Sequence, residues 1–238
     1  MSPGAVGAAR RTPAAARPLV VELVGAAAVG KSTLVAELRR RDPGVRWLQR
    51  ARRNGGHTSL ARHVAGFAPA WLAAVTRSPA YTWRNARYFL RLAALEEVVR
   101  RAAHEAPGVV MLEHGPVFTL ARLRAFHDGP VPAPLARYGA RLLSRWATIL
   151  DLVVALDAPL EVLAKRMHTR SKAHPMRGST TEEFGDFVRR YRAAYEAVLA
   201  ELRAAGGPPV LTLHTDREPV AALADRVRAA LEQTRHAR

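Results

Sequence analysis

Residues 19–33 read LVVELVGAAAVGKST, and this stretch determines the fold. Its first six residues are an apolar, β-branched run that is typical of a buried strand. The next nine match the pattern G-x-x-x-x-G-K-[ST] in full. A helical pattern over 31–41 follows, and Asp42-Pro43-Gly44 ends it. The motif binds phosphate only when it lies between a strand and a helix, and the sequence predicts this order here.

A loop of this kind binds the phosphates of a nucleotide. Glycine lets the backbone turn tightly, so its N–H groups converge on phosphate oxygens, and the helix adds the positive end of its dipole. Lys31 would reach the β- and γ-phosphates, and the Ser32 hydroxyl would coordinate Mg²⁺. The sequence thus predicts bound ATP and Mg²⁺. The predicted loop consists of Gly25, Ala26, Ala27, Ala28, Val29, Gly30, Lys31, Ser32 and Thr33.

Strands and helices alternate through the rest of the chain. Four further strands are predicted at 45–48, 109–112, 152–156 and 210–213. Helices are predicted at 59–76, 80–105, 134–149, 159–168, 181–204 and 218–235. Thr180 and Glu183 form a capping box at the start of the longest of these, and Gly115-Pro116 is interpreted as a turn. The alternation predicts an α/β fold: one three-layer domain with a five-stranded parallel sheet and helices on both faces.

The composition excludes several classes of protein. Residues 1–17 contain Ala, Pro, Gly and Arg without an apolar stretch, which predicts a disordered tail and not a secretory signal. No apolar run approaches the ~20 residues that would span a bilayer, so no membrane partner is predicted. Cysteine is absent, which excludes a disulfide framework and a zinc–thiolate site. This composition is compatible with a reducing cytoplasm, and we predict a cytoplasmic protein.

The net charge of +17 at first suggests nucleic acid as a partner. Only three of the 37 basic side chains are lysine, however, and the arginines are spread along the whole chain. This pattern is typical of a general bias toward Arg and Ala and not of a nucleic-acid-binding patch. We therefore do not predict nucleic acid as the main partner, although the positive field suits a polyphosphate substrate.

Glu113 directly follows the predicted strand at 109–112. In a sheet of this kind that strand lies beside the first one, so its carboxyl end faces the phosphates. A carboxylate there can hold Mg²⁺ through water or accept a proton from an attacking hydroxyl. The alternative is a polar residue that merely ends a strand.

A basic segment precedes the longest helix. Arginines that close over the phosphates from a lid, here around 166–180, stabilise the charge of a moving phosphoryl group. The alternative interpretation is a solvated run of charge. The segment contains Arg166, Arg170, Lys172 and Arg177. With Lys31 and Glu113, Arg166 and Arg170 complete the predicted catalytic set.

Aromatic and basic side chains crowd the helix predicted at 80–105. The functional interpretation is an acceptor pocket, in which a ring stacks on the acceptor and an arginine binds its anionic group. The alternative is a core face of aromatic rings opposite an exposed basic face. The candidate acceptor residues are Arg84, Arg87 and Arg91.

Residues 19–235 resemble the nucleoside and nucleotide monophosphate kinases, most closely those like thymidylate kinase. The resemblance depends on VELVGAAAVGKSTLVAEL, VVMLEHGPVF, LDAPLEVLAKRMHTRSKAH with the helix after it, and LTLHTD. It implies a P-loop fold over 18–238 with strand order 2-3-1-4-5, ATP and Mg²⁺. It also implies a lid with Arg166 and Arg170, and acceptor contact by Arg91.

Two departures from that family concern the acceptor. Thymidylate kinases usually have Asp-Arg-Tyr or Asp-Arg-Phe after the third strand, where this chain has Glu113-His114-Gly115. The Arg-Glu-Pro of that family is absent from 45–60. Because those motifs bind the acceptor nucleotide, the resemblance implies a divergent acceptor site.

The sequence therefore predicts an enzyme that transfers the γ-phosphoryl group of ATP to a nucleotide, a nucleoside or another small metabolite. The alternative is a P-loop ATPase or GTPase that acts as a switch or with nucleic acid. A motor would show an Asp-Glu pair after a strand, and a GTPase would need Asn-Lys-x-Asp. Neither is visible, and no lysine occurs between 31 and 165. A homodimer is compatible with the sequence.

Overall fold

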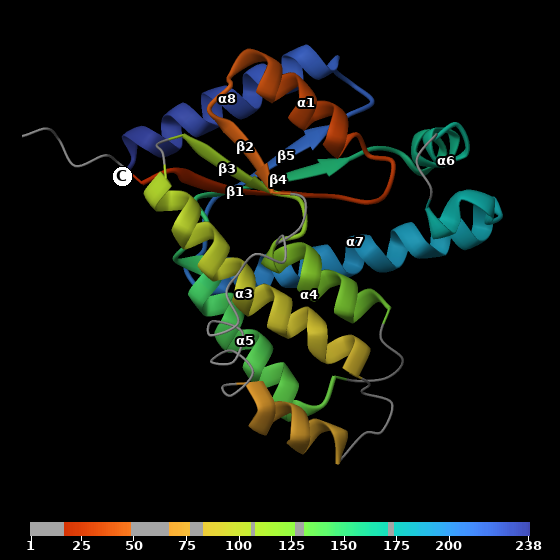
Figure 1. The fold of residues 1–238 in the computed structure, drawn as a ribbon. Helices are drawn as coiled ribbons and strands as arrows, with labels where there is room; N and C mark the ends of the chain where they lie inside the picture. Colours follow the sequence, from red (N-terminus) through yellow and green to blue (C-terminus); the bar gives the residue numbers. More distant parts are fainter. Residues whose placement is uncertain (1–16, 49–66, 77–82, 106–107, 127–130, 171–173) are drawn as a thin grey trace, which may run out of the picture.

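The computed structural model describes residues 17–48, 67–76, 83–105, 108–126, 131–170 and 174–238. Figure 1 shows a single sheet with helical layers on both of its faces. The strands are parallel and lie in the order β2-β3-β1-β4-β5. The predicted α/β fold, its five-stranded sheet and the strand order are thus confirmed.

The strand β1 occupies the centre of the sheet, between β3 and β4, and all six of its residues are buried. In a parallel sheet with this order, the carboxyl end of the central strand faces the crevice where ligands bind. The loop after β1 therefore begins at the middle of that edge. The strands are β1 Leu19–Val24, β2 Val45–Leu48, β3 Val109–Leu112, β4 Leu152–Asp157 and β5 Val210–His214.

The helices form two unequal layers (Figure 1). Helices α1 and α8 cover one face of the sheet, and α3, α4, α5 and α7 cover the other. Residues 67–75 are also helical. The helices are α1 Lys31–Arg41, α3 Trp83–Glu105, α4 Pro116–Ala125, α5 Ala133–Ala147, α6 Leu160–His168, the short 3₁₀ helix η1 Pro175–Gly178, α7 Thr181–Ala204 and α8 Val220–His236.

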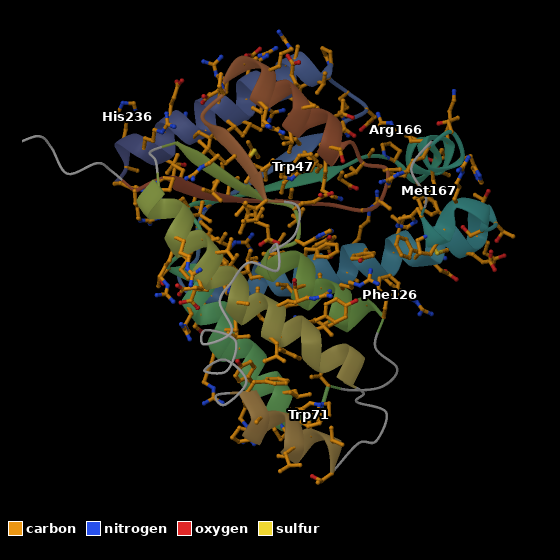
Figure 2. All side chains as sticks on the ribbon, viewed as in Figure 1. Trp47, Trp71, Phe126, Arg166, Met167 and His236 are labelled. Atoms are coloured by element: carbon orange, nitrogen blue, oxygen red, sulfur yellow. The ribbon has the colours of Figure 1, made fainter. Side chains whose placement is uncertain are left out.

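The side chains of β1 alternate between two cores, as the pleat of a strand requires. Val20 and Val24 pack toward α3, α4, α5 and α7, where Trp146 is completely buried. Val21 and Leu23 pack toward α1 and α8. The larger layer extends far from the sheet, and Figure 2 shows Trp71 at its distant end. No helix within the described residues is both long and apolar enough to cross a membrane.

Most predicted helices are confirmed to within a few residues. The capping box is also confirmed: the Thr180 hydroxyl accepts the Glu183 N–H at 3.2 Å, and a Glu183 carboxylate oxygen accepts the Thr180 N–H at 2.8 Å. The predicted helical stretch at 59–66 lies outside the described residues.

The interpretation of Gly115-Pro116 as a simple turn was wrong. Pro116 is the first residue of α4, a helix that the sequence analysis did not predict. Proline suits this position because its fixed φ matches the helix and its missing N–H would have no partner in the first turn. Five of the first six residues of α4 are buried, so α4 lacks the polar face on which helix prediction depends.

Asp151 connects the two ends of the described chain. It is buried, and its carboxylate accepts the Val20 N–H at 2.7 Å. Arg17 pairs with it at 3.0 Å, and Arg238 also pairs with it. Arg17 is the last residue of the predicted tail, and residues 1–16 lie outside the described part of the chain.

We expect Asp151→Ala to lower the free energy of unfolding by about 2 kcal/mol, because it leaves a buried N–H without its acceptor. The control is Asp186→Ala, since Asp186 forms an exposed ion pair with Arg189 on α7, and a surface pair contributes less than about 1 kcal/mol. Urea unfolding of both variants measures the difference. Equal losses of stability would contradict the structural role of Asp151.

Candidate functional site

A cavity of about 900 Å³ lies at the carboxyl edge of the sheet. The loop after β1 forms its floor, and side chains from α4, α6 and the chain after it, α7, and the connection between β5 and α8 form its walls. The predicted residues Lys31, Ser32, Glu113, Arg166 and Arg170 all line this cavity. The fold thus brings together predicted residues that are up to 139 positions apart in the sequence, from Lys31 to Arg170.

The backbone of the loop has the conformation that its glycines predict. Gly25 has φ 140°, and a Cβ atom there would stand 2.4 Å from the carbonyl oxygen of Leu156 on β4. Gly30 has φ 99° and caps α1. Ala28 also has a positive φ, 65°, which is uncommon for a residue with a side chain and is typical of functional loops.

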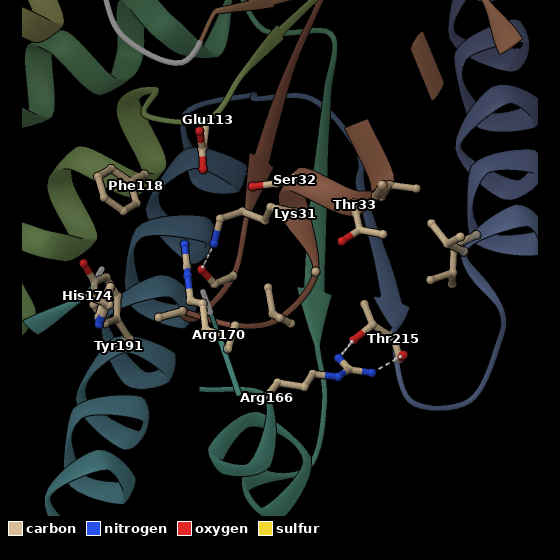
Figure 3. A pocket seen from close by; sticks show the side chains of 18 of the residues that line it. Lys31, Ser32, Thr33, Glu113, Phe118, Arg166, Arg170, His174, Tyr191 and Thr215 are labelled. Atoms are coloured by element: carbon tan, nitrogen blue, oxygen red, sulfur yellow. Dashed lines mark hydrogen bonds between the residues drawn. The ribbon is translucent and has the colours of Figure 1, made fainter. Parts of the chain in front are cut away.

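The amine of Lys31 lies inside the loop. It donates hydrogen bonds to the carbonyl oxygens of Gly25 at 2.7 Å and Ala26 at 3.0 Å. Burial lowers the pKa of Lys31 to about 8, the Glu113 carboxylate opposes this shift, and the positive charge of Arg170 adds to it. Lys31, Glu113 and Arg170 therefore act on each other electrostatically, and Figure 3 shows the three side chains converging.

Ser32 and Glu113 offer oxygen ligands on the same side of Lys31 (Figure 3). A hydroxyl and a carboxylate are ligands that Mg²⁺ prefers, and this ion commonly completes its shell with waters and substrate phosphates. Among the described residues, no three His, Asp or Glu side chains form a metal-binding group. The hydroxyl of Ser32 and the carboxylate of Glu113 thus fit an ion that takes its remaining ligands from water and substrate.

Arg166 and Arg170, the two arginines of the predicted catalytic set, have different positions. Arg170 follows the end of α6 and points toward Lys31 (Figure 3). Arg166 donates to the Thr215 hydroxyl at 2.8 Å and to the Thr215 carbonyl at 2.9 Å. These bonds hold Arg166 beside Thr215, in the connection that leads to the start of α8, and not beside Lys31. Lys172 lies outside the described residues.

Arg122 on α4 is a cavity residue that the sequence analysis missed. Its Nε donates to the Tyr88 hydroxyl at 3.1 Å, and its Nη1 faces the Tyr191 hydroxyl at 3.4 Å. In the described part of the chain, no hydrogen bond or ion pair joins this half-buried guanidinium to a carboxylate. Only tertiary structure could reveal the site, because Tyr88 and Tyr191 are far from Arg122 in sequence.

A cluster of aromatic rings centred on Tyr191 lies next to Arg122. The ring of Tyr191 lies 6.4 Å from that of Phe118, 5.0 Å from that of Phe187 and 4.8 Å from that of Phe126, measured between centroids. Phe118, Phe187 and Tyr191 line the cavity. This end, which we call the aromatic end, is therefore suited to a planar or apolar ligand.

His174 contributes a polar group to the aromatic end. Its Nδ1 accepts the N–H of Met176 at 3.2 Å. Burial lowers the pKa of His174, and the positive charges of Arg170, Arg122 and Lys31 lower it further. The imidazole is therefore neutral at physiological pH, with its proton on Nε2, where it can donate to a ligand.

Of the predicted acceptor arginines, Arg91 does not line the cavity. Arg91 is exposed, its guanidinium lies 6.0 Å from the centroid of the Tyr88 ring, and it is not a lining residue. Arg84 and Arg87 belong to α3, but their side chains lie outside the described part of the structure.

Comparisons with known proteins establish the fold. No model of a known protein family and no curated sequence matches the chain. Among solved structures, thymidylate kinase from Candida albicans has a TM-score of 0.58 at 15% identity, over 92% of this chain and 93% of that one. YorR from Bacillus subtilis, in complex with phosphorylated GDP, gives 0.52 at 14% identity, over 91% and 98%. Deoxyadenosine kinase from M. mycoides, with products bound, gives 0.51 at 12% identity, over 90% and 100%. The chain is thus structurally similar to P-loop nucleoside and nucleotide kinases at low sequence identity.

We expect nucleotide affinity to fall as the pH rises through about 8, because the Lys31 amine then loses the proton that attracts phosphate. Well above pH 8 the affinity should fall by about tenfold per pH unit, because the neutral Lys31 amine must take up a proton when the nucleotide binds. Titration with a fluorescent ATP analogue measures it. Lys31→Arg should remove the pH dependence, because arginine stays charged, and Lys31→Ala should lose binding and turnover. Unchanged affinity of the natural protein up to about pH 10 would contradict the assignment.

Proposed function

We propose that this protein is an ATP-dependent phosphotransferase that moves the γ-phosphoryl group of ATP to a small molecule. One observation supports this most directly: the cavity continues past the phosphate loop into the aromatic end. In Figure 3, Thr215 and Arg166 lie on one side of Lys31, and Phe118, His174 and Tyr191 lie on the other. A switch ATPase or GTPase needs space for a nucleotide and a water molecule, whereas a kinase needs space for a second substrate.

The two sides of the cavity suit different ligands. Val220 and Leu223 of α8 line the side that holds Arg166 and Thr215. Apolar side chains and a fixed guanidinium plane suit a nucleobase, which can stack on the guanidinium. We therefore place the adenine of ATP on this side and the acceptor at the aromatic end. Thymidylate and deoxyadenosine are the first acceptors to test, because the similar solved proteins are named for them.

Each polar residue between the two sides has a role in this mechanism. Lys31 neutralises the β- and γ-phosphates, and Ser32 and Glu113 would hold Mg²⁺, which would offset the charge of the phosphates. When the acceptor attacks through a hydroxyl group, Glu113 accepts the hydroxyl proton as the acceptor oxygen bonds to the γ-phosphorus and the bond between that phosphorus and the ADP oxygen breaks. An acceptor that attacks through an ionised phosphate oxygen, such as thymidylate, has no proton to transfer. Arg170 stabilises the charge of the transferring group. Closure of the segment around 166–180 would exclude water from the reaction.

A screen of nucleosides, nucleotides and small hydroxyl compounds, with ADP and free phosphate measured separately, tests this function. A kinase should form ADP and a phosphorylated acceptor in equal amounts, with little free phosphate. Equal amounts of ADP and free phosphate with every acceptor would favour the alternative, a P-loop ATPase.

We expect Arg170→Ala to lower the rate of transfer by about 10³, the scale seen for arginines that stabilise phosphoryl transfer. Nucleotide affinity should change much less, because the charge develops mainly in the transition state. The matched control is Arg177→Ala, because Arg177 is exposed and is not a lining residue. If affinity and rate decline equally, Arg170 only binds ATP. If neither declines, the segment is a solvated run of charge.

We expect Arg122→Gln to raise the KM of an anionic acceptor by about tenfold or more, because one charge-assisted hydrogen bond contributes about 1.5–3 kcal/mol. The KM of ATP should stay unchanged, since Arg122 stands on the other side of Lys31 from Thr215. Arg91→Gln is the control for loss of one arginine near Tyr88. An equal effect of both substitutions would show that general charge, and not contact, determines acceptor binding.

A further inference from the structure

Glu22 is an acidic residue in the middle of the central, otherwise apolar strand β1. Its side chain has no exposed surface. The pleat of β1 turns it to the same side as Val20 and Val24, toward α3, α4, α5 and α7. Its partners across the sheet, Leu112 and Val153, are apolar. A carboxyl group in such a place is costly unless specific hydrogen bonds hold it.

The hydrogen bonds of Glu22 come from the first turn of α4. One carboxylate oxygen accepts the Val117 N–H at 3.0 Å, and the other accepts the Phe118 N–H at 2.8 Å. The first N–H groups of a helix have no partner inside the helix, and they form the positive end of its dipole. Glu22 thus supplies from β1 the cap that no residue preceding α4 supplies.

Gly115 leaves the space for this contact. A Cβ atom at Gly115 would stand 2.5 Å from the carboxyl carbon of Glu22 and less than 3 Å from both of its oxygens. Any residue other than glycine would therefore displace the carboxyl group or α4. The Gly115-Pro116 pair, which looked like an ordinary turn in the sequence, is thus built around the Glu22 side chain.

The helix that Glu22 holds carries two residues of the aromatic end. Phe118 donates its N–H to Glu22 and lines the cavity with its ring, and Arg122 follows one turn later. On the other side of the contact, Glu22 is three residues before Gly25, where the phosphate loop begins. Glu22 therefore connects the strand that leads into the phosphate loop directly with the helix that faces the acceptor.

We propose that Glu22 is a positioning residue: its buried carboxyl group fixes the first turn of α4 to β1 and so sets Phe118 and Arg122 relative to the phosphate loop. Its consequence for an acceptor rests on the proposed function. The contact itself does not, because it is defined by β1, α4 and Gly115 alone.

The burial of Glu22 links the position of α4 to a proton. Burial raises the pKa of Glu22 from 4.5 to about 7, although the N–H groups of Phe118, Val117 and Gly115 lower it. The titratable side chain that faces Glu22 from α7 is Tyr195. Burial raises the pKa of Tyr195 well above its ordinary value, and the charge of Glu22 adds to this shift. Movement of α4 that admits water returns Glu22 to its ordinary pKa, so between pH 4.5 and about 7 this opening releases a proton.

The sign of the pH effect follows from this linkage. The closed arrangement binds the proton more tightly than the hydrated one, so opening becomes easier as the pH rises from 4.5 to about 7. Above that value the carboxyl group is ionised in both states, and the dependence ends. Opening at α4 should therefore increase by about tenfold per pH unit within this interval.

Hydrogen exchange of the full chain tests the proposal without any acceptor. After correction for intrinsic exchange, protection of the Val117 and Phe118 amides should decrease by about tenfold for each unit by which the pH rises between 4.5 and about 7. The Leu34 amide, which donates to Gly30 in the first turn of α1, is the internal control and should show no such dependence. Protection at Val117 and Phe118 that does not change with pH would overturn the proposal, and this measurement requires no variant.

Glu22→Gln assigns the proton. The variant should lose the pH dependence at Val117 and Phe118, whereas Glu96→Gln should keep it, because Glu96 is also buried but pairs with Arg145 on α5. An unchanged pH dependence in Glu22→Gln would show that another group titrates, and would overturn the proposal.

A kinetic measurement tests the positioning role. With an acceptor from the screen, Glu22→Gln should raise the KM of the acceptor by about fivefold, since the amide can accept only one of the two N–H groups. The KM of ATP should not change. Equal increases in both values would mean a general loss of structure and would contradict the role. If no acceptor is found, the proposed function fails while the exchange result still decides on the contact.

Discussion

The close approach of Gly25 to β4 is the constraint on which the site depends. A Cβ atom at Gly25 would meet the carbonyl oxygen of Leu156 at 2.4 Å, so only glycine allows the chain to leave β1 along this path. The same residue offers its carbonyl oxygen to Lys31 at 2.7 Å and to the Tyr195 hydroxyl at 3.4 Å. A strand, the loop lysine and the longest helix thus meet at one peptide group. Because they meet there, the phosphate loop has a fixed position relative to both ends of the cavity.

The aromatic end of the cavity depends on contacts between side chains and not on a backbone turn. Its charge, Arg122, is held by phenol hydroxyls and not by a carboxylate in the described structure. A guanidinium held in this way has a fixed position and keeps its net positive charge for a ligand. The neighbouring His174 is neutral because burial and nearby cations lower its pKa. The cavity therefore combines a strongly charged centre at Lys31 and Arg170 with an end that is mostly aromatic.

The sequence predicts the sheet and the phosphate loop well, because both depend on local patterns. The apolar runs, the loop motif and the capping box at Thr180 can each be recognised within a few residues. The helix α4 could not be recognised, because five of its first six residues are buried and its cap, Glu22, is more than ninety positions away. For the same reason Arg122 was missed and Arg91 was favoured: whether an arginine faces a cavity depends on packing between helices. The hydrogen bonds of Arg166 also lay beyond the sequence, since Thr215, to which it donates, is 49 positions away.

The helix α7 begins at the capping box that follows η1 and runs without interruption to Tyr195, whose hydroxyl contacts the carbonyl oxygen of Gly25. Each residue of a helix turns the chain by about 100° and advances it by about 1.5 Å. One inserted residue between Thr180 and Tyr191 would therefore rotate the start of α7, with its capping box, by about 100° relative to Tyr191 and Tyr195. The number of residues in this part of α7 thus determines how the start of the helix is oriented relative to the loop at Gly25.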